Sequence, residues 1–236
     1  TTGTPYSVGQ KTEVIDMKNP NFVCPGLPDY PLEMAYGVGG LIGNIPLICG
    51  GQKGYTGYSN RTFYDDCFKL EEKQWVPAGK LRQPRSQMGY GNVVFGTRLF
   101  VSGGIFGENR QGSRVNEMIG LQSSSRLKDM PTHRVNHCNI PFNDTHIMVI
   151  DSSEVGFFNM KTEEFSKGPL LNTNRRQLHG CVKAEIGDKP IIFVTGGVSY
   201  FTRLASTEYF DLSQPDNGWT YGKKLDNSQL FGKAPS

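Results

Sequence analysis

The sequence predicts an all-β fold, a β-propeller made of four-stranded antiparallel blades, and two observations indicate it. A short apolar strand that ends in two glycines occurs three times, closing at Gly50-Gly51, Gly103-Gly104 and Gly196-Gly197. A short strand repeated in this way, at a period of about 50 residues, is typical of propeller blades. No stretch of the chain shows a sustained helical period of apolar residues, so we expect few helices.

The composition agrees with a loop-rich β protein. The 236 residues include 29 glycines and 14 prolines, and 11% of the residues are aromatic. The net charge of +3 is too small to indicate binding to nucleic acid or to an anionic membrane. The uncharged stretch 34–52 contains six glycines and a proline, which predicts two short strands and no membrane span.

Aromatic residues recur in step with the doublets and set the blade boundaries. The recurring pairs are Phe68 with Trp75, Phe158 with Phe165, and Phe210 with Trp219. We expect a single domain, 1–236, with an N-terminal half blade at 11–31 and four full blades at about 35–81, 88–131, 135–171 and 177–225. The inner strand of the second blade is expected at Gly89-Tyr90-Gly91. The third blade carries Asp151-Ser152 in place of the glycines, so only its aromatic pair identifies it.

The half blade would need two inner strands from elsewhere to complete a ring. Residues 226–236 are too few for two strands and a turn, so ring closure by this segment is not supported. We expect either a missing segment or a further subunit in an oligomer to complete the ring.

These motifs resemble the kelch-repeat family, in which an apolar strand ending in Gly-Gly is followed by an aromatic residue and then by a tryptophan near the outer edge of the blade. The resemblance covers about residues 11–225 and includes the arginine-bearing lead Pro84-Arg85-Ser86. The cysteine-bearing strand 47–51, followed by Cys67, is similar to secreted kelch-like proteins of invertebrates. The resemblance implies a kelch-type β-propeller with four full blades and a half blade.

Antiparallel order within a blade places every loop between its second and third strands on one face, together with the connections between blades. Three of these loops, 52–62, 105–113 and 198–205, are long and mix aromatic with basic residues. The candidate ligand-binding residues are Tyr55, Tyr58, Arg61, Phe106, Arg110, Tyr200, Phe201 and Arg203. Ordinary solvated loops and a recognition surface are both compatible with this composition.

The connections between blades add Arg85, Arg134 and the pair Arg175-Arg176 at matching places. One interpretation is structural, with each guanidinium bound to carbonyl groups of the neighbouring blade. The other is that Arg85, Arg134 and Arg176 converge at the mouth of the channel and attract a carboxylate or phosphate group of a ligand. The kelch resemblance implies the second geometry, because kelch proteins that bind acidic peptides use it.

Five cysteines and two glycosylation sequons favour an extracellular, secreted protein. Cys49 and Cys67 lie on neighbouring strands of one blade and are expected to form a disulfide. Cys138 and Cys181 lie on inner strands of consecutive blades and form either a second disulfide or two buried thiols. Cys24 has no evident partner. The sequons place glycans at Asn60 and Asn143.

Catalytic motifs are absent from the sequence, so we expect a non-enzymatic binding module without a cofactor, whose partner is a protein, a glycan or a small molecule. One alternative is a binder of a small apolar ligand or chromophore. A further alternative is a copper radical oxidase, because such enzymes share the kelch propeller. His137 and His179 are equivalent to Met34 and Met88 of earlier blades and are weak candidates for metal ligands, but no third ligand is evident.

Overall fold

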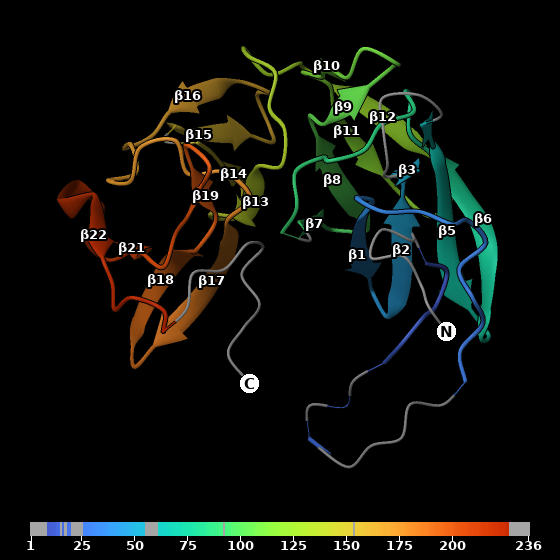
Figure 1. Ribbon diagram of the computed structural model, residues 1–236, viewed down its shortest axis with the longest axis horizontal. Coiled ribbons are helices and arrows are strands. Elements are labelled where there is room, and N and C mark those ends of the chain that lie inside the picture. The colour runs from blue at the N-terminus through green and yellow to red at the C-terminus, as the bar shows by residue number, and fades with distance from the viewer. Residues whose placement is uncertain are drawn as a thin grey trace.

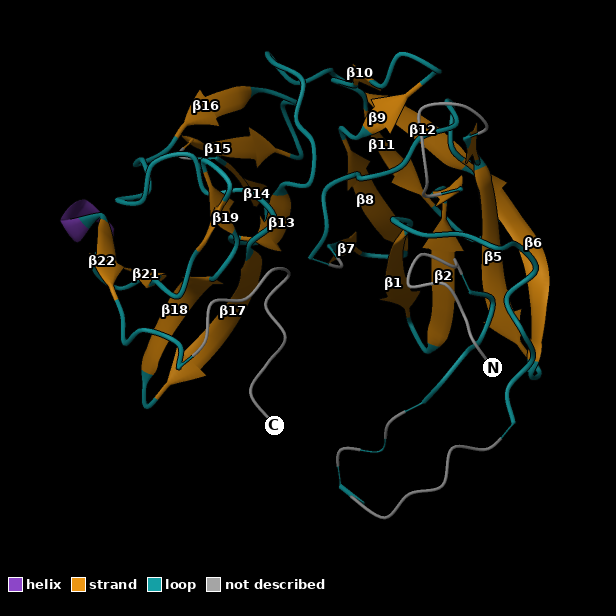
Figure 2. Ribbon diagram, viewed as in Figure 1, coloured by secondary structure: helices purple, strands orange, loops and turns teal. Residues whose placement is uncertain are grey.

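The computed structural model describes residues 9–14, 16, 18–19, 26–54, 61–91, 93–152 and 154–226. These residues form an all-β fold, as the sequence predicts, and the one helical element among them is a short 3-10 turn, η1 (Pro215–Asn217). Figure 2 shows how strands dominate the molecule. Within the described part of the chain, no helix has the length and apolar character to cross a membrane.

Four antiparallel sheets of four strands each follow one another along the chain, and we number them sheets 1 to 4. Sheet 1 contains β1 (Val38–Ile42), β2 (Ile45–Cys49), β5 (Asp66–Glu71) and β6 (Gln74–Lys80), and sheet 2 contains β7 (Val94–Phe95), β8 (Arg98–Ser102), β11 (Asn116–Ile119) and β12 (Ser124–Leu127). Sheet 3 contains β13 (Cys138–Pro141), β14 (His146–Asp151), β15 (Glu154–Asn159) and β16 (Phe165–Lys167), and sheet 4 contains β17 (Gly180–Ile186), β18 (Lys189–Thr195), β21 (Thr207–Asp211) and β22 (Trp219–Tyr221). Each expected unit therefore holds one four-stranded sheet.

The four sheets stand side by side in an open arc, with the first strand of each toward the centre and the last toward the outside (Figure 1). Apolar side chains fill the space between neighbouring sheets. Leu47 of sheet 1 packs in one cluster with Leu99 of sheet 2, and Phe100 of sheet 2 packs with Phe158 of sheet 3. A third cluster joins sheets 3 and 4 and includes Ile150 and Trp219. The core is thus divided into layers that lie between the sheets.

The half blade expected at 11–31 is described only in part. The described residues 10–14 and 26–30 form no strand, and the other residues expected there lie largely outside the described residues. The described part still covers the outer side of sheet 1. Tyr30 packs edge-on against Phe68 and Trp75, and the Trp75 indole donates to the Thr12 hydroxyl and the Pro28 carbonyl.

The inner strand of sheet 2 differs from the expectation. It is formed by β7, whereas Tyr90 leaves the sheet and forms a parallel bridge with Cys138 of sheet 3. The Tyr90 N–H donates to the His137 carbonyl at 3.0 Å. The flanking glycine Gly91 has a φ of +119°. A Cβ there would overlap the Asn139 carbonyl, so glycine allows the two backbones to approach.

The glycine doublets are explained by two close backbone approaches. Gly50 and Gly51 have φ values of +65° and +99°, in the left-handed region that favours glycine. A Cβ on Gly51 would lie 2.9 Å from the Ala35 carbonyl oxygen of its own sheet, and one on Gly50 would lie 2.8 Å from the Arg85 carbonyl oxygen at the start of sheet 2. The Gly103-Gly104 doublet makes the same two approaches, to Arg134 and Ser86, so each of these two doublets lies between its own sheet and the segment that leads into the next sheet.

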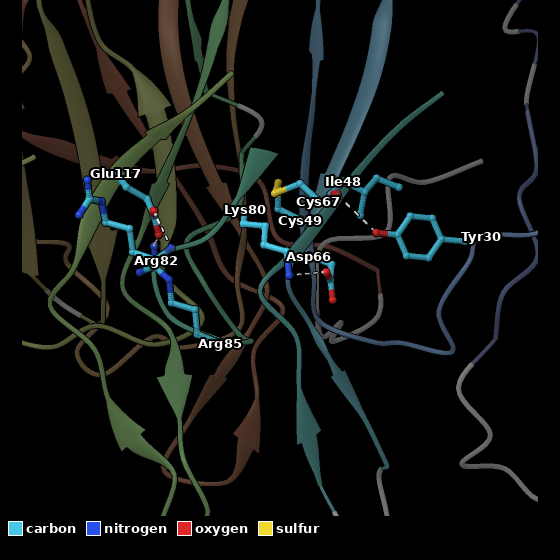
Figure 3. The surroundings of a disulfide bond; sticks show 9 residues. All are labelled: Tyr30, Ile48, Cys49, Asp66, Cys67, Lys80, Arg82, Arg85 and Glu117. Atoms are coloured by element: carbon cyan, nitrogen blue, oxygen red, sulfur yellow. Dashed lines mark hydrogen bonds and ion pairs between the residues drawn. A yellow bond between two sulfur atoms is a disulfide. The ribbon is translucent and has the colours of Figure 1, made fainter. Parts of the chain in front are cut away.

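The expected pair Cys49–Cys67 lies at disulfide distance, and so do Cys138 and Cys181, for which the sequence left a disulfide and two thiols open. Cys49 and Cys67 face each other across β2 and β5 with their Cα atoms 4.0 Å apart. Figure 3 shows this pair beside Tyr30, whose hydroxyl donates to the Ile48 carbonyl at 3.4 Å. Cys138 and Cys181 join β13 to β17 with their Cα atoms 6.4 Å apart, so the second pair fastens sheet 3 to sheet 4. Cys24 lies outside the described residues.

Candidate functional site: the hairpin face

Three two-stranded ribbons extend from the ends of the second strands, at the positions of the long loops in the sequence. They are β3 (Gln52–Lys53) with β4 (Thr62–Phe63), β9 (Ile105–Phe106) with β10 (Gln111–Gly112), and β19 (Val198–Ser199) with β20 (Thr202–Arg203). Sheet 3 has a tight turn instead, between Asp151 and Glu154. We call the side that carries the ribbons the hairpin face.

A continuous set of backbone hydrogen bonds shows that the leads into the sheets lie on this same face. Ala35 in the lead to sheet 1 bridges to Gln52 at the base of the first ribbon, and Ser86 and Gln177 bridge in the same way to the bases of the other two. The Gly51 N–H donates to the Arg85 carbonyl at 2.9 Å, which joins the first doublet to the second lead. We call this chain of hydrogen bonds the belt.

The tip of the β19–β20 hairpin exposes two aromatic side chains. Tyr200 and Phe201 form a two-residue turn with φ values of +46° and +72°, and their side chains are 62% and 99% exposed. Such turns favour Asn-Gly, because a residue with a Cβ is strained in the left-handed region. The Arg175 guanidinium lies 4.6 Å from the centre of the Tyr200 ring. The turn thus exposes two aromatic side chains to solvent, in a backbone conformation that disfavours residues with a Cβ.

The other candidate residues of the loops do not form a cluster like that of Tyr200, Phe201 and Arg175. Arg110 is exposed in the turn of the β9–β10 hairpin, Phe106 is half-buried, and Arg203 is exposed on β20. Arg61 is half-buried at the base of the first ribbon, and its Nε and Nη1 atoms have no hydrogen-bond partner. Tyr55, Tyr58 and Asn60 lie outside the described residues.

Arg85 and Arg176 are buried and bound within the protein. The Nη1 atom of Arg85 donates to the Gly103 and Val115 carbonyls at 2.8 and 2.9 Å, and its Nη2 atom donates to Glu117 (Figure 3). Arg176 repeats these contacts with the Gly196 and Ser206 carbonyls and with Glu208, at 2.6, 3.0 and 3.0 Å. The carbonyls belong to the sheet that each arginine leads into, and not to the neighbouring one. Because neither side chain is exposed, neither arginine faces a ligand.

Arg134 occupies the equivalent place in sheet 3 but has different partners. Its Nη2 atom donates to Glu154 at 3.3 Å, its Nη1 atom lies 3.8 Å from the Asp151 carboxylate, and its guanidinium lies 5.4 Å from the centre of the Phe165 ring. In sheet 1 this place belongs to Met34, because Met34 precedes Ala35 as Arg85 precedes Ser86. The sequence alignment of Met34 with Met88 is therefore wrong by three residues.

His137 and His179 are buried beside Tyr90, which donates its backbone N–H to the His137 carbonyl and its hydroxyl to the His179 carbonyl. Burial, together with nearby arginine charge, lowers the pKa of each imidazole to about 3. The His137 Nε2 atom lies 2.7 Å from the Ser102 hydroxyl, but its Nδ1 atom has no orienting partner and Ser102 is not exposed. Among the described residues, no group of three or more His, Cys, Asp or Glu side chains could hold a metal ion.

Asn143 lies exposed in the turn between β13 and β14. Its Oδ1 atom accepts from the Thr145 N–H at 2.9 Å and from the Thr145 hydroxyl at 3.1 Å. The sequon therefore lies in an exposed turn that the side-chain oxygen of Asn143 helps to hold.

No family model matches the chain, and no curated protein matches it in sequence. The chain is similar to a solved structure described as the structure of YjhT, with 10% sequence identity and a TM-score of 0.76, over 97% of this chain and 87% of that one. At this identity the similarity shows a shared fold and nothing more.

Sequence reasoning missed the acidic partners of the buried arginines. Glu117 and Glu208 each lie 32 residues after their arginine, and this equal spacing was the available signal. Tyr200 and Phe201 were candidates from the sequence, but nothing in the sequence indicated the tight turn that they form, because local propensity disfavours both residues in the left-handed conformation.

Proposed function

We propose that the protein is a non-enzymatic, extracellular binding module, a kelch-type β-propeller that binds a protein, glycan or small molecule through the hairpin face. Extracellular placement is supported by the two cysteine pairs at disulfide distance and by the sequon at Asn143. The kelch assignment rests on the sequence motifs. The similarity to YjhT concerns the fold alone.

The β19–β20 turn is the observation that carries the binding proposal. A fully exposed phenylalanine in a left-handed conformation costs stability twice, once through backbone strain and once through exposed apolar surface. Strained residues of this kind cluster at functional sites. Aromatic and arginine side chains also dominate the binding energy of protein interfaces, and here Arg175 packs on Tyr200 beside Phe201.

The test uses the double variant Tyr200→Asn/Phe201→Gly, which gives the turn its preferred residues. Wild-type protein and the variant are applied to a glycan array and to a displayed library of random peptides, and the ligands that wild type selects are titrated against both proteins. We expect the variant to lose at least about tenfold in affinity while its melting temperature rises, because the turn strain of about 1 kcal/mol per residue is relieved.

Ile186→Asn is the matched control, because Ile186 is 65% exposed at the opposite end of sheet 4. It should leave the selected ligands bound. Equal affinity of the double variant and the wild type for those ligands would show that the proposal is wrong, and so would a wild type that selects no ligand.

A small apolar ligand is a second candidate, favoured by a cavity of about 480 Å³ among the inner strands. Its lining includes Leu41 and Pro46 of sheet 1, Val94 of sheet 2 and Pro141 of sheet 3. An absorption spectrum and an organic extract of native material test this candidate, because a bound chromophore would give a visible band. No observation on the described residues favours a copper radical oxidase, and no group of three or more of their His, Cys, Asp or Glu side chains could hold a metal ion.

A further inference from the structure

Arg134 is buried like its two equivalents, with a side chain 5% exposed where theirs are 0% exposed, but its hydrogen bonds are far less complete. Arg85 and Arg176 each donate from Nη1 to two carbonyls and from Nη2 to a buried glutamate. The Nη1 atom of Arg134 has no hydrogen-bond partner, whereas the Nε atom lacks one in all three arginines. Its one hydrogen bond goes to Glu154, whose side chain is 64% exposed.

The internal carboxylate is missing because sheet 3 has lost the residues that would hold it. Glu117 pairs with Val101 in sheet 2, and the residue at the equivalent register in sheet 3 is Gly156, which pairs with Val149. The backbone N–H of Arg82, which donates to Glu117, is also lost, since proline stands three residues before Arg134. The Phe165 ring lies against Gly156 in the space that a glutamate side chain would need.

A cavity of about 340 Å³ opens beside this guanidinium. One part of its lining is apolar and contains Phe165, Val155 and Leu170, of which Leu170 is 64% exposed. The other part contains Arg134, Lys167 and Glu154. Lys167 forms no ion pair within the described part of the chain. The lining of the cavity thus combines Lys167 and Arg134, whose Nη1 atom is buried without a hydrogen-bond acceptor, with a patch of hydrocarbon. We call it the Arg134 cavity.

We propose that the Arg134 cavity binds a small monocarboxylate with an apolar body. The carboxylate accepts hydrogen bonds from Arg134 and Lys167, and the apolar body lies on Phe165 and Leu170. A guanidinium with free donors binds a carboxylate through short charge-assisted hydrogen bonds, and burial of the apolar body adds the hydrophobic contribution. The size of the cavity is within the range of small-molecule sites.

The local charge favours a monoanion over a phosphate dianion. Arg134 and Lys167 supply two positive charges, whereas the carboxylates of Asp151 and Glu154 lie within 3.8 and 3.3 Å of the Arg134 guanidinium. The site is therefore close to neutral before a ligand enters. Each negative charge on the ligand is repelled by these two carboxylates, so a dianion such as phosphate is opposed about twice as strongly as a monocarboxylate. This site differs from the β19–β20 tip, so it does not rest on the proposed function.

The experiment is a titration of the whole chain with phenylacetate, followed by isothermal calorimetry and by NMR of labelled protein. We expect saturable binding of one phenylacetate per chain, with shifts at Phe165 and Leu170. The neutral isostere phenylacetamide should bind at least about tenfold more weakly, because it cannot form the charge-assisted hydrogen bonds. Acetate, which lacks the ring, and inorganic phosphate should also bind more weakly than phenylacetate.

Two variants locate the binding. Lys167→Met removes an exposed charge without disturbing the core and should weaken phenylacetate binding severalfold, whereas Lys161→Met, an exposed lysine in the β15–β16 turn, should leave it unchanged. Arg134→Met should abolish binding, and methionine already occupies the equivalent place in sheet 1. The proposal is overturned if phenylacetate does not saturate the protein, if phenylacetamide or phosphate binds as well, or if Lys167→Met has no effect.

Discussion

Arg85 and Glu117 form an ion pair from which solvent is completely excluded, both side chains having no exposed surface. Arg176 and Glu208 repeat it at the same separation of 32 residues. In each pair the glutamate also accepts from backbone N–H groups of the lead, that of Arg82 in sheet 2 and those of Asn172 and Thr173 in sheet 4. The arginine therefore links the doublet to the third strand, and the glutamate links that strand to the lead.

Breaking this pair should be strongly destabilising. Arg85→Met leaves the Glu117 carboxylate buried without its cation, and we expect a loss of about 3–5 kcal/mol in the free energy of unfolding, measured by urea titration. The double variant Arg85→Met/Glu117→Phe copies the residues of sheet 1, where Met34 and Phe68 hold these places. It should lose less than Arg85→Met alone, because no charge remains buried. Arg98→Met, at an exposed arginine, serves as the control and should change stability by less than about 0.5 kcal/mol.

Acid should destabilise the protein below pH 6.5, because the folded state keeps His137 and His179 neutral. Burial lowers the pKa of both imidazoles from 6.5 to about 3. Between these pH values the unfolded chain binds two protons that the folded chain does not. The contribution of the two neutral histidines to the free energy of unfolding is therefore complete above pH 6.5 and is lost as the pH falls toward 3.

Asp151 opposes this loss. Burial raises the pKa of its carboxyl from 3.8 to about 6, so the folded state holds one extra proton between these values. These three groups together give a slope of about 1.4 kcal/mol per pH unit near pH 5, and Asp151→Asn should steepen it to about 2.7. Urea titrations from pH 4 to 8 measure both slopes. Equal slopes for wild type and variant would contradict the assignment to Asp151.

The two disulfides should contribute unequally to stability. Cys138 and Cys181 are 43 residues apart, whereas Cys49 and Cys67 are 18 residues apart. The longer loop restricts the unfolded chain more, and the difference corresponds to about 0.8 kcal/mol. We therefore expect Cys138→Ala/Cys181→Ala to lower the free energy of unfolding by more than Cys49→Ala/Cys67→Ala. A peptide map of unreduced protein establishes both pairings, and the opposite order of stability would contradict the loop argument.

Asn143 should carry a glycan when the chain passes through a secretory pathway. The Thr145 hydroxyl donates to the Asn143 side chain within an exposed turn, so the acceptor is accessible. The intact mass should fall on treatment with a glycosidase. Thr145→Ala should abolish the glycan at this site, and Thr145→Ser should keep it. A fully unmodified Asn143 in secreted wild-type protein would refute the prediction.

The sheets could be predicted from sequence because each doublet is required by the local backbone. Gly51 adopts a left-handed conformation close to the Ala35 carbonyl, so only glycine fits there without strain. The same requirement produces a Gly-Gly pair in the sequence of each repeat that has this backbone geometry. The Cys49–Cys67 pair could also be predicted, because the strand order places the two residues on neighbouring strands, opposite each other. Local rules were sufficient for the glycine doublets and for the cysteines of neighbouring strands.

Features that depend on distant residues could not be predicted. Tyr90 leaves its own sheet to pair with Cys138, and no local property of the segment indicates this bridge. The burial of Arg85 depends on Glu117, and the different state of Arg134 depends on Gly156. A repeated arginine alone does not tell whether its acceptor comes from the protein or from a ligand.

The hydrogen bonds of the belt join each sheet to its immediate neighbour, so the stability of a sheet depends on how many neighbours it has. Sheets 1 and 4 close the two ends of the described arc, so each packs against one other sheet where sheets 2 and 3 pack against two. The Cys138–Cys181 bond ties sheet 4 covalently to sheet 3, while the bond in sheet 1 ties that sheet only to itself. Because the sheets stabilise one another through nearest-neighbour contacts, we expect the backbone amides of sheet 1 to be the first to lose their protection from hydrogen exchange.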